Sequence, residues 1–161
     1  MLSPQTWAPP PEGFIKINFD GASKGNPIPA RYGGFWDSDG VLIYLYIRYV
    51  GVTSNNAAEL EVLLQGLNIA IAEFHQKVII EGGSQILINI LKKIQHGSPI
   101  WKLSNNWHLD DGLHAIHLAT SKIIALFPMH VKRNANKVVD HMANVGVELG
   151  PHYINSNADH I

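Results

Sequence analysis

Strict alternation of apolar and polar residues in the run from Gly13 to Asp20 is the feature that most constrains the fold. The two sets would line opposite faces of an extended strand: Ile15, Ile17 and Phe19 on one face, and Lys16, Asn18 and Asp20 on the other. A second extended run at 32–38 leads into Asp39-Gly40, a strong hairpin signal, and residues 41–50 are rich in β-branched and aromatic side chains. The pattern predicts three antiparallel strands joined as a meander.

The rest of the chain alternates helical and extended patterns. Asn55 or Asn56 can cap a long helix whose apolar stripe is formed by Leu60, Leu63, Leu64, Leu67, Ile71 and Phe74. The elements predicted after it are a buried strand at 77–81, helices at 84–95 and 109–124, a strand at 126–132 and a helix at 136–149. Hairpin strands followed by β–α crossovers predict an α/β fold, with a five-stranded mixed sheet and helices on both faces.

Length and composition indicate one domain. The 161 residues are 46% hydrophobic, which is enough for a real core. We expect a proline-rich lead-in at 1–12, a folded domain at 13–150 and a flexible tail at 151–161. Cysteine is absent, which excludes disulfides and thiolate metal sites. The formal net charge of −1 gives no global positive field for nucleic acid.

The chain shows no sign of a targeting or membrane segment. Its first residues lack the basic and apolar regions of a secretory signal, and its longest apolar stretch, residues 63–74, is too short to cross a bilayer. We therefore expect an intracellular protein, cytoplasmic or nuclear, that does not bind membranes.

Three carboxylates occur in a fixed order along these elements. Asp20 ends the first predicted strand, Glu59 lies near the start of the long helix, and Asp140 lies on the last helix. This arrangement resembles the type I ribonuclease H family, in particular its plant and retroelement branch, and the resemblance covers about residues 7–150. In that family an Asp-Ser pair follows the fourth strand, and here the pair is Gly83-Ser84.

The resemblance implies hydrolysis of the RNA strand of an RNA/DNA hybrid by two Mg²⁺ ions, with Mn²⁺ as an alternative cofactor. Asp20 would bridge the two ions, while Glu59 and Asp140 would each hold one. Arg133 stands where the shorter family members carry a basic residue, and His130, within a predicted strand, is a weaker candidate. Glycine offers no side-chain oxygen, so we expect Gly83 to impair cleavage severely.

Two groups could fill the gap at Gly83. Glu81, two residues earlier and hence on the same strand face, is a candidate substitute ligand, although it lies about 6–7 Å upstream. Water could take the vacant coordination position instead.

Two loops match those that contact the RNA strand in the family. They contribute Gly25 and Asn26 from one loop and Asn55 and Asn56 from the other. The partners expected from the resemblance are an RNA/DNA hybrid and a larger reverse-transcriptase polypeptide, with the domain itself monomeric. Two hypotheses stay open: an impaired endonuclease, and a pseudoenzyme that serves as a nucleic-acid-binding or protein-interaction module.

Overall fold

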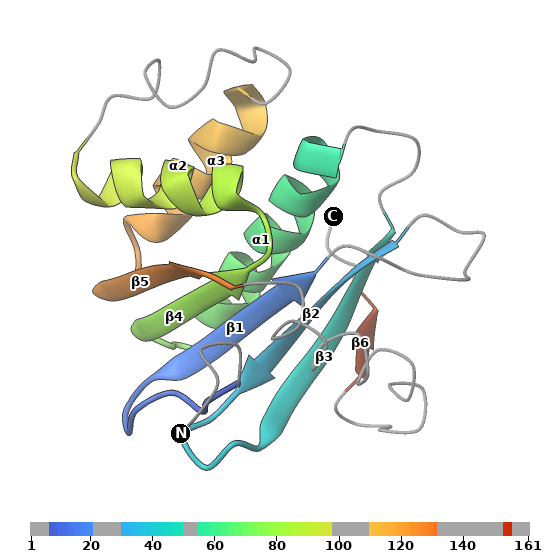
Figure 1. The fold of residues 1–161 in the computed structure, drawn as a ribbon, viewed down its shortest axis with the longest axis vertical. Coiled ribbons are helices and arrows are strands. Elements are labelled where there is room, and N and C mark those ends of the chain that lie inside the picture. Colours follow the sequence, from blue (N-terminus) through green and yellow to red (C-terminus); the bar gives the residue numbers. More distant parts are fainter. Residues whose placement is uncertain (1–6, 21–29, 50–54, 98–109, 132–152, 156–161) are drawn as a thin grey trace.

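A six-stranded sheet with three helices forms the described part of the protein (Figure 1). The computed structural model describes residues 7–20, 30–49, 55–97, 110–131 and 153–155. The strands are β1 (Ile15–Asp20), β2 (Ala30–Trp36), β3 (Leu42–Tyr49), β4 (Lys77–Gly82), β5 (Ala125–His130) and β6 (Tyr153–Asn155), and the helices are α1 (Asn55–Ala72), α2 (Gln85–Gln95) and α3 (Asp110–Thr120).

The strand pairings confirm the predicted meander and crossovers. β1 pairs antiparallel with β2, and β2 with β3, while β4 lies parallel to β1 and β5 parallel to β4. The strand order is β5-β4-β1-β2-β3-β6. The predicted α/β fold with a mixed sheet is therefore confirmed, with one addition at the edge next to β3.

The addition is β6, which falls within the segment that we expected to be a flexible tail. Its residues pair parallel with Leu45, Tyr46 and Ile47 of β3. Three residues carry too short a pattern to be recognised as a strand without the neighbour that pairs with them.

The apolar face of the sheet packs against all three described helices. Ile15, Ile17 and Phe19 are buried in one core with residues of α1, α2 and α3. The alternation in β1 therefore predicts correctly which face joins the hydrophobic core, although Lys16 and Asn18 on the other face are buried as well. Helices were expected on both faces; the one predicted at 136–149 lies outside the described residues, and the three that are described share a single face.

The opposite face is covered in part by residues 7–14, which we had assigned largely to an extended lead-in. The Trp7 and Trp36 rings lie 4.9 Å apart, centroid to centroid, and Phe14 lies 5.7 Å from Phe127 of β5. Pro10 is buried. This segment, called the N-terminal strap below, is thus packed on the sheet because its aromatic residues cover apolar groups of β2 and β5.

Tyr46 crosses the core in a slot between two glycines. A Cβ at Gly33, its partner on β2, would lie 2.2 Å from the Tyr46 ring, and a Cβ at Gly66 of α1 would lie 2.5 Å from its hydroxyl oxygen. The hydroxyl donates to the carbonyl oxygen of Val62 at 2.8 Å. Burial raises the pKa of Tyr46 far above its ordinary value, so the hydroxyl remains a donor.

Among the described strands, β5 is the last on the side of β4. The amide of Ala125 donates to Gln76 at 2.9 Å and that of Val131 to Gly82 at 3.0 Å, so the odd-numbered amides of β5 point to β4. The amides and carbonyls of the even-numbered residues of β5 point away from β4. There the Leu126 carbonyl accepts from the Gln95 side chain of α2, and Pro128 has no amide proton.

Among the helices described, none combines the length and the apolar character that crossing a bilayer requires.

Candidate functional site

Asp20 and Gly83 occupy neighbouring positions at the carboxyl edge of the sheet. Asp20 is the last residue of β1, and Gly83 directly follows β4. Phe19 is in register with Gly82 across the parallel pair, so Asp20 and Gly83 are the next two positions along these strands. Neighbouring strands lie about 4.8 Å apart, which places the two backbones within reach of one shared ligand. The structure thus places Asp20, the predicted metal-bridging residue, beside Gly83, where the predicted fourth carboxylate is missing.

The two consecutive glycines at this edge play different parts. A Cβ at Gly82 would lie 2.3 Å from the Phe19 ring, so packing requires glycine there. Gly83 is exposed. Among the glycines described, positive φ occurs at Gly13, Gly40 and Gly97, so Gly83 has a backbone conformation open to aspartate.

The turn after Gly83 is held from both sides. Ser84 caps α2, and its side-chain oxygen accepts from the amide of Leu87 at 3.3 Å. His130, which is in register with Gly82 at the end of β5, has its Nε2 atom 3.2 Å from the Gly83 carbonyl oxygen. The weaker candidate His130 therefore borders the site, where it contacts the backbone of the turn.

Glu59 lies five residues into α1 and is half-buried. Gly66, two turns later, packs against Ile17 in the middle of β1, where an added Cβ would lie 3.1 Å from the Ile17 side chain. Figure 1 shows the first turns of α1 on the side of the molecule at which β1 ends. The helix thus carries Glu59 toward the carboxyl edge that holds Asp20 and Gly83.

The other predicted site residues are described in part or not at all. Asn55 and Asn56 open α1, so the structure gives their backbone position at the start of the helix. Gly25, Asn26, Arg133 and Asp140 lie outside the described residues, and their roles stay predictions.

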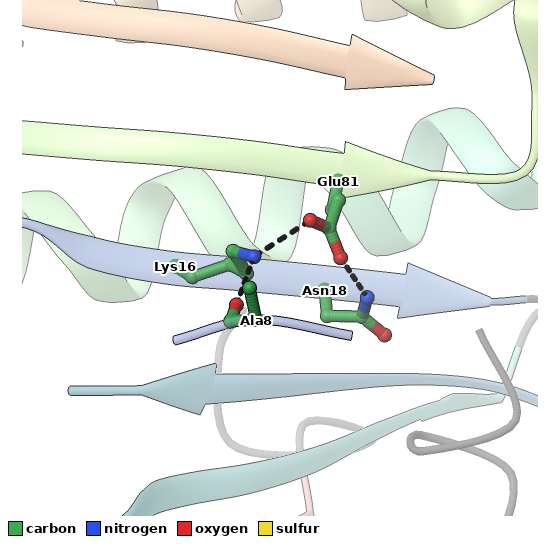
Figure 2. A network of polar contacts seen from close by, with 4 residues as sticks. All are labelled: Ala8, Lys16, Asn18 and Glu81. Atoms are coloured by element: carbon green, nitrogen blue, oxygen red, sulfur yellow. Dashed lines mark hydrogen bonds and ion pairs between the residues drawn. The ribbon is translucent and has the colours of Figure 1, made fainter. Parts of the chain in front are cut away.

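Glu81 is engaged elsewhere. Its side chain is buried, its Oε2 atom lies 2.7 Å from the Lys16 ammonium nitrogen, and its Oε1 atom accepts from the Asn18 amide at 3.0 Å (Figure 2). Both oxygens therefore have partners within the protein. The predicted role as a substitute ligand gains no support from this geometry.

The described residues by themselves do not make a complete metal site. No three of their histidine, aspartate and glutamate side chains come together as an ion would require. At position 83 the chain contributes only backbone atoms, since glycine has no side-chain donor. The ligand roles of Asp20, Glu59 and Asp140 therefore stay predictions.

Sequence reasoning missed the network of Lys16, Asn18 and Glu81. A signal for it was present: Glu81 directly follows the apolar residues 78–80 of the predicted strand, and Lys16 stands in a central strand. A charge in a buried strand needs a partner of opposite sign, and these two residues were available.

Comparisons with known proteins agree with this architecture. The family described as "Reverse transcriptase-like" matches residues 18–146. A protein of Arabidopsis thaliana, whose name assigns it provisionally to the ribonuclease H proteins, is 30% identical over 144 residues. That alignment includes 89% of this chain and 22% of the relative, so this chain spans about a fifth of the relative's length.

Solved structures show the same fold at low identity. Ribonuclease H1 of the archaeon Halobacterium salinarum superposes with a TM-score of 0.63 at 24% identity, over 85% of this chain and 99% of the other. LC11 ribonuclease H1, solved in complex with an RNA/DNA hybrid, superposes with a TM-score of 0.62 at 23% identity, over 79% of this chain and 91% of the other. The foamy viral protease-reverse transcriptase with RNA/DNA hybrid gives 0.61 at 12% identity, over 91% of this chain and 21% of that one.

Proposed function

Because the chain belongs to the reverse-transcriptase-like family, whose ribonuclease H fold it shares, we propose that it binds RNA/DNA hybrids and that Gly83 impairs its cleavage of the RNA strand. The observation that carries the proposal is the register of β1 and β4, in which Asp20 and Gly83 are neighbours. A carboxylate at position 83 would share an ion with Asp20, and this chain lacks it.

Asp20, Glu59 and Asp140 would hold the divalent ions, Mg²⁺ or Mn²⁺. Such ions, when bound, supply an activated water and stabilise the leaving oxygen. The chain's own contribution is to place Asp20 at the end of a central strand and Glu59 on a helix packed against that strand. Arg133 would provide a basic group near the scissile phosphate. With no oxygen from position 83, metal affinity and turnover fall together.

Hybrid binding would use residues next to the candidate site in the sequence. Asn55 and Asn56 at the start of α1 would contact the RNA strand, together with Gly25 and Asn26, which follow β1 in the sequence. RNA is distinguished from DNA chiefly through its 2′-hydroxyl groups, which amide side chains and backbone groups can bind. The structural neighbour that was solved with a hybrid supports this proposal.

A second candidate function is a pseudoenzyme that binds hybrid or a protein without cutting. It is favoured by Glu81, the nearest described carboxylate along β4, whose two oxygens are both engaged by Lys16 and Asn18. The chain matches only 22% of the length of its Arabidopsis relative, which supports a role within a longer reverse-transcriptase-like polypeptide. Within that polypeptide we propose that the domain acts as a monomer in the cytoplasm or nucleus.

The test is cleavage of a labelled RNA/DNA hybrid with Mg²⁺ and with Mn²⁺. The chain as it stands is compared with Gly83→Asp and with Gly83→Asn, which has the same size but no charge. We expect strong cleavage only for the aspartate variant, and we expect Asp20→Asn to abolish it. Metal-free binding of hybrid should be similar for all variants.

Each outcome separates the hypotheses. Cleavage by the unaltered chain would show an active enzyme in which water fills the gap. An inert but folded Gly83→Asp variant that still binds hybrid would favour the pseudoenzyme. Absence of hybrid binding in every variant would refute the proposed function.

A further inference from the structure

A buried polar network lies two residues before the candidate site on each of the two strands. Asn18 and Glu81 are direct partners in the register of β1 and β4, and Asp20 and Gly83 are each two residues further along. Two residues of strand span about 6–7 Å and return to the same face of the sheet. The network and the candidate site therefore occupy successive positions along the same pair of strands.

Every charged group in the network has its partners inside the protein. The Lys16 ammonium contacts Glu81 Oε2 at 2.7 Å, donates to the carbonyl oxygen of Ala8, and lies 5.0 Å from the centroid of the Trp7 ring. The Lys16 and Glu81 side chains are each only 5% exposed. Figure 2 shows Lys16 between Glu81 and the strap residue Ala8.

Asn18 takes its orientation from Glu81. Its amide nitrogen donates to Glu81 Oε1, whereas its oxygen is buried and has no partner among the described residues. One carboxylate thus ties together a lysine and an asparagine of β1 from its place on β4. Through Lys16 the same carboxylate is linked to the N-terminal strap.

Stability alone does not account for this arrangement. Replacing a buried ion pair by apolar residues of similar volume is often neutral or stabilising, because desolvation offsets the attraction between the charges. The pair sits in a sheet whose neighbouring positions are filled by apolar side chains, such as Ile79 on β4 and Trp36 on β2. A directional contact between two particular strands has a different use: it fixes how their ends lie relative to each other.

We infer that Lys16, Asn18 and Glu81 form a positioning clamp that holds the carboxyl ends of β1 and β4 in register, so that the backbones of Asp20 and Gly83 stay side by side. The inference rests on the proposed function. The clamp touches neither substrate nor metal; it acts through the backbones that carry the ligands. Lys16 also neutralises Glu81, which keeps this nearby carboxylate from competing with Asp20 for the cation.

The experiment uses the full chain with Gly83→Asp as the reference protein. The clamp is replaced by the apolar pair Lys16→Met and Glu81→Leu, and Gln95→Leu serves as a matched control that removes a polar contact to β5 away from the site. Three properties are measured: the urea midpoint of unfolding, hybrid affinity without metal, and the Mn²⁺ dissociation constant by calorimetry without substrate.

We expect the clamp variant to stay folded with a modestly lower urea midpoint, because the buried Asn18 amide loses Glu81 as its acceptor, and to keep its metal-free hybrid affinity. Its Mn²⁺ dissociation constant should rise by about 10-fold or more, the usual effect of removing groups that orient metal ligands. Turnover should fall through kcat with little change in the KM for hybrid. The Gln95→Leu control should match the reference protein in all of these.

Two results would overturn the inference in different ways. If the clamp variant binds Mn²⁺ as tightly as the reference protein, the network is only structural, while the proposed function stands. If the Gly83→Asp reference itself binds no Mn²⁺, the proposed function fails and the clamp has no site to position.

Discussion

The slot that holds Tyr46 predicts a strong energetic coupling between Gly66 and Tyr46. Gly66→Ala introduces a Cβ that would lie 2.5 Å from the Tyr46 hydroxyl oxygen and 3.1 Å from Ile17. The hydroxyl cannot move away freely, because it is buried and bonded to Val62 at 2.8 Å. The substitution therefore places a methyl group against a fixed atom.

The magnitude follows from two opposing effects. Alanine should favour the helix by about 1 kcal/mol relative to glycine, and overpacking against an atom at 2.5 Å should cost about 2–3 kcal/mol, the upper part of the usual range, so we expect Gly66→Ala to destabilise the protein by about 1–2 kcal/mol. Tyr46→Phe alone should cost about 1 kcal/mol through the lost hydrogen bond. Once Tyr46→Phe has removed the hydroxyl, the nearest ring atom is at 3.3 Å, and Gly66→Ala should then cost little or nothing.

The assay is urea unfolding of the two single variants and the double variant, followed by far-UV circular dichroism. We expect a coupling free energy of about 1–2 kcal/mol in the double-mutant cycle. Asn68→Ala, on the exposed side of α1, is the control and should act equally with and without Tyr46→Phe. Additivity of Gly66→Ala and Tyr46→Phe within about 0.5 kcal/mol would refute the fixed slot.

Three further predictions concern the network, a helix cap and pH. Lys16→Met alone leaves Glu81 buried without its cation and should destabilise by about 3–5 kcal/mol, whereas adding Glu81→Leu should recover most of that loss; urea midpoints of both variants check this. Ser84→Ala removes the cap of α2 and should cost about 1 kcal/mol, measured in the same way; no change in midpoint would show that the cap is dispensable. Burial lowers the pKa of His75, and the nearby Glu73 opposes this in part. Neutral His75 is therefore favoured in the folded protein. Its contribution to the free energy of unfolding is complete above the unfolded-state pKa of about 6.5 and is lost as the pH falls toward the folded-state pKa. Between pH 7.5 and pH 5.5 the unaltered chain should therefore lose more stability than His75→Phe does. An equal loss in both proteins would contradict the lowered pKa.

Much of the fold could be predicted because its signals are local. The alternation that places Ile17 in the core depends only on the two-residue period of a strand, and Asp39-Gly40 forms a turn through its own backbone preferences. The strap and β6 were not predicted as part of the folded sheet, because their order depends on distant partners. Trp7 packs against Trp36 and Lys16, which are brought to it only by the folded sheet.

The candidate site was predictable in its order along the chain but not in its surroundings. The position of Gly83 after a strand was clear from the sequence, and the register then set it beside Asp20. The commitment of Glu81 to Lys16 was not foreseen, since strand pairing decides which charges meet. The substitute-ligand hypothesis considered only how far the Glu81 side chain reaches along β4. It did not consider Lys16 and Asn18 on β1, which bind Glu81 instead.

The outer edge of β5 has a consequence for how the protein behaves at high concentration. An exposed strand edge offers unpaired amides and carbonyls that can recruit a strand of another molecule, which is a common start of aggregation. Here Pro128 removes the central outward donor, and Gln95 occupies the outward carbonyl of Leu126. We therefore expect replacement of both residues to leave this strand edge more open to pairing with a strand of another molecule.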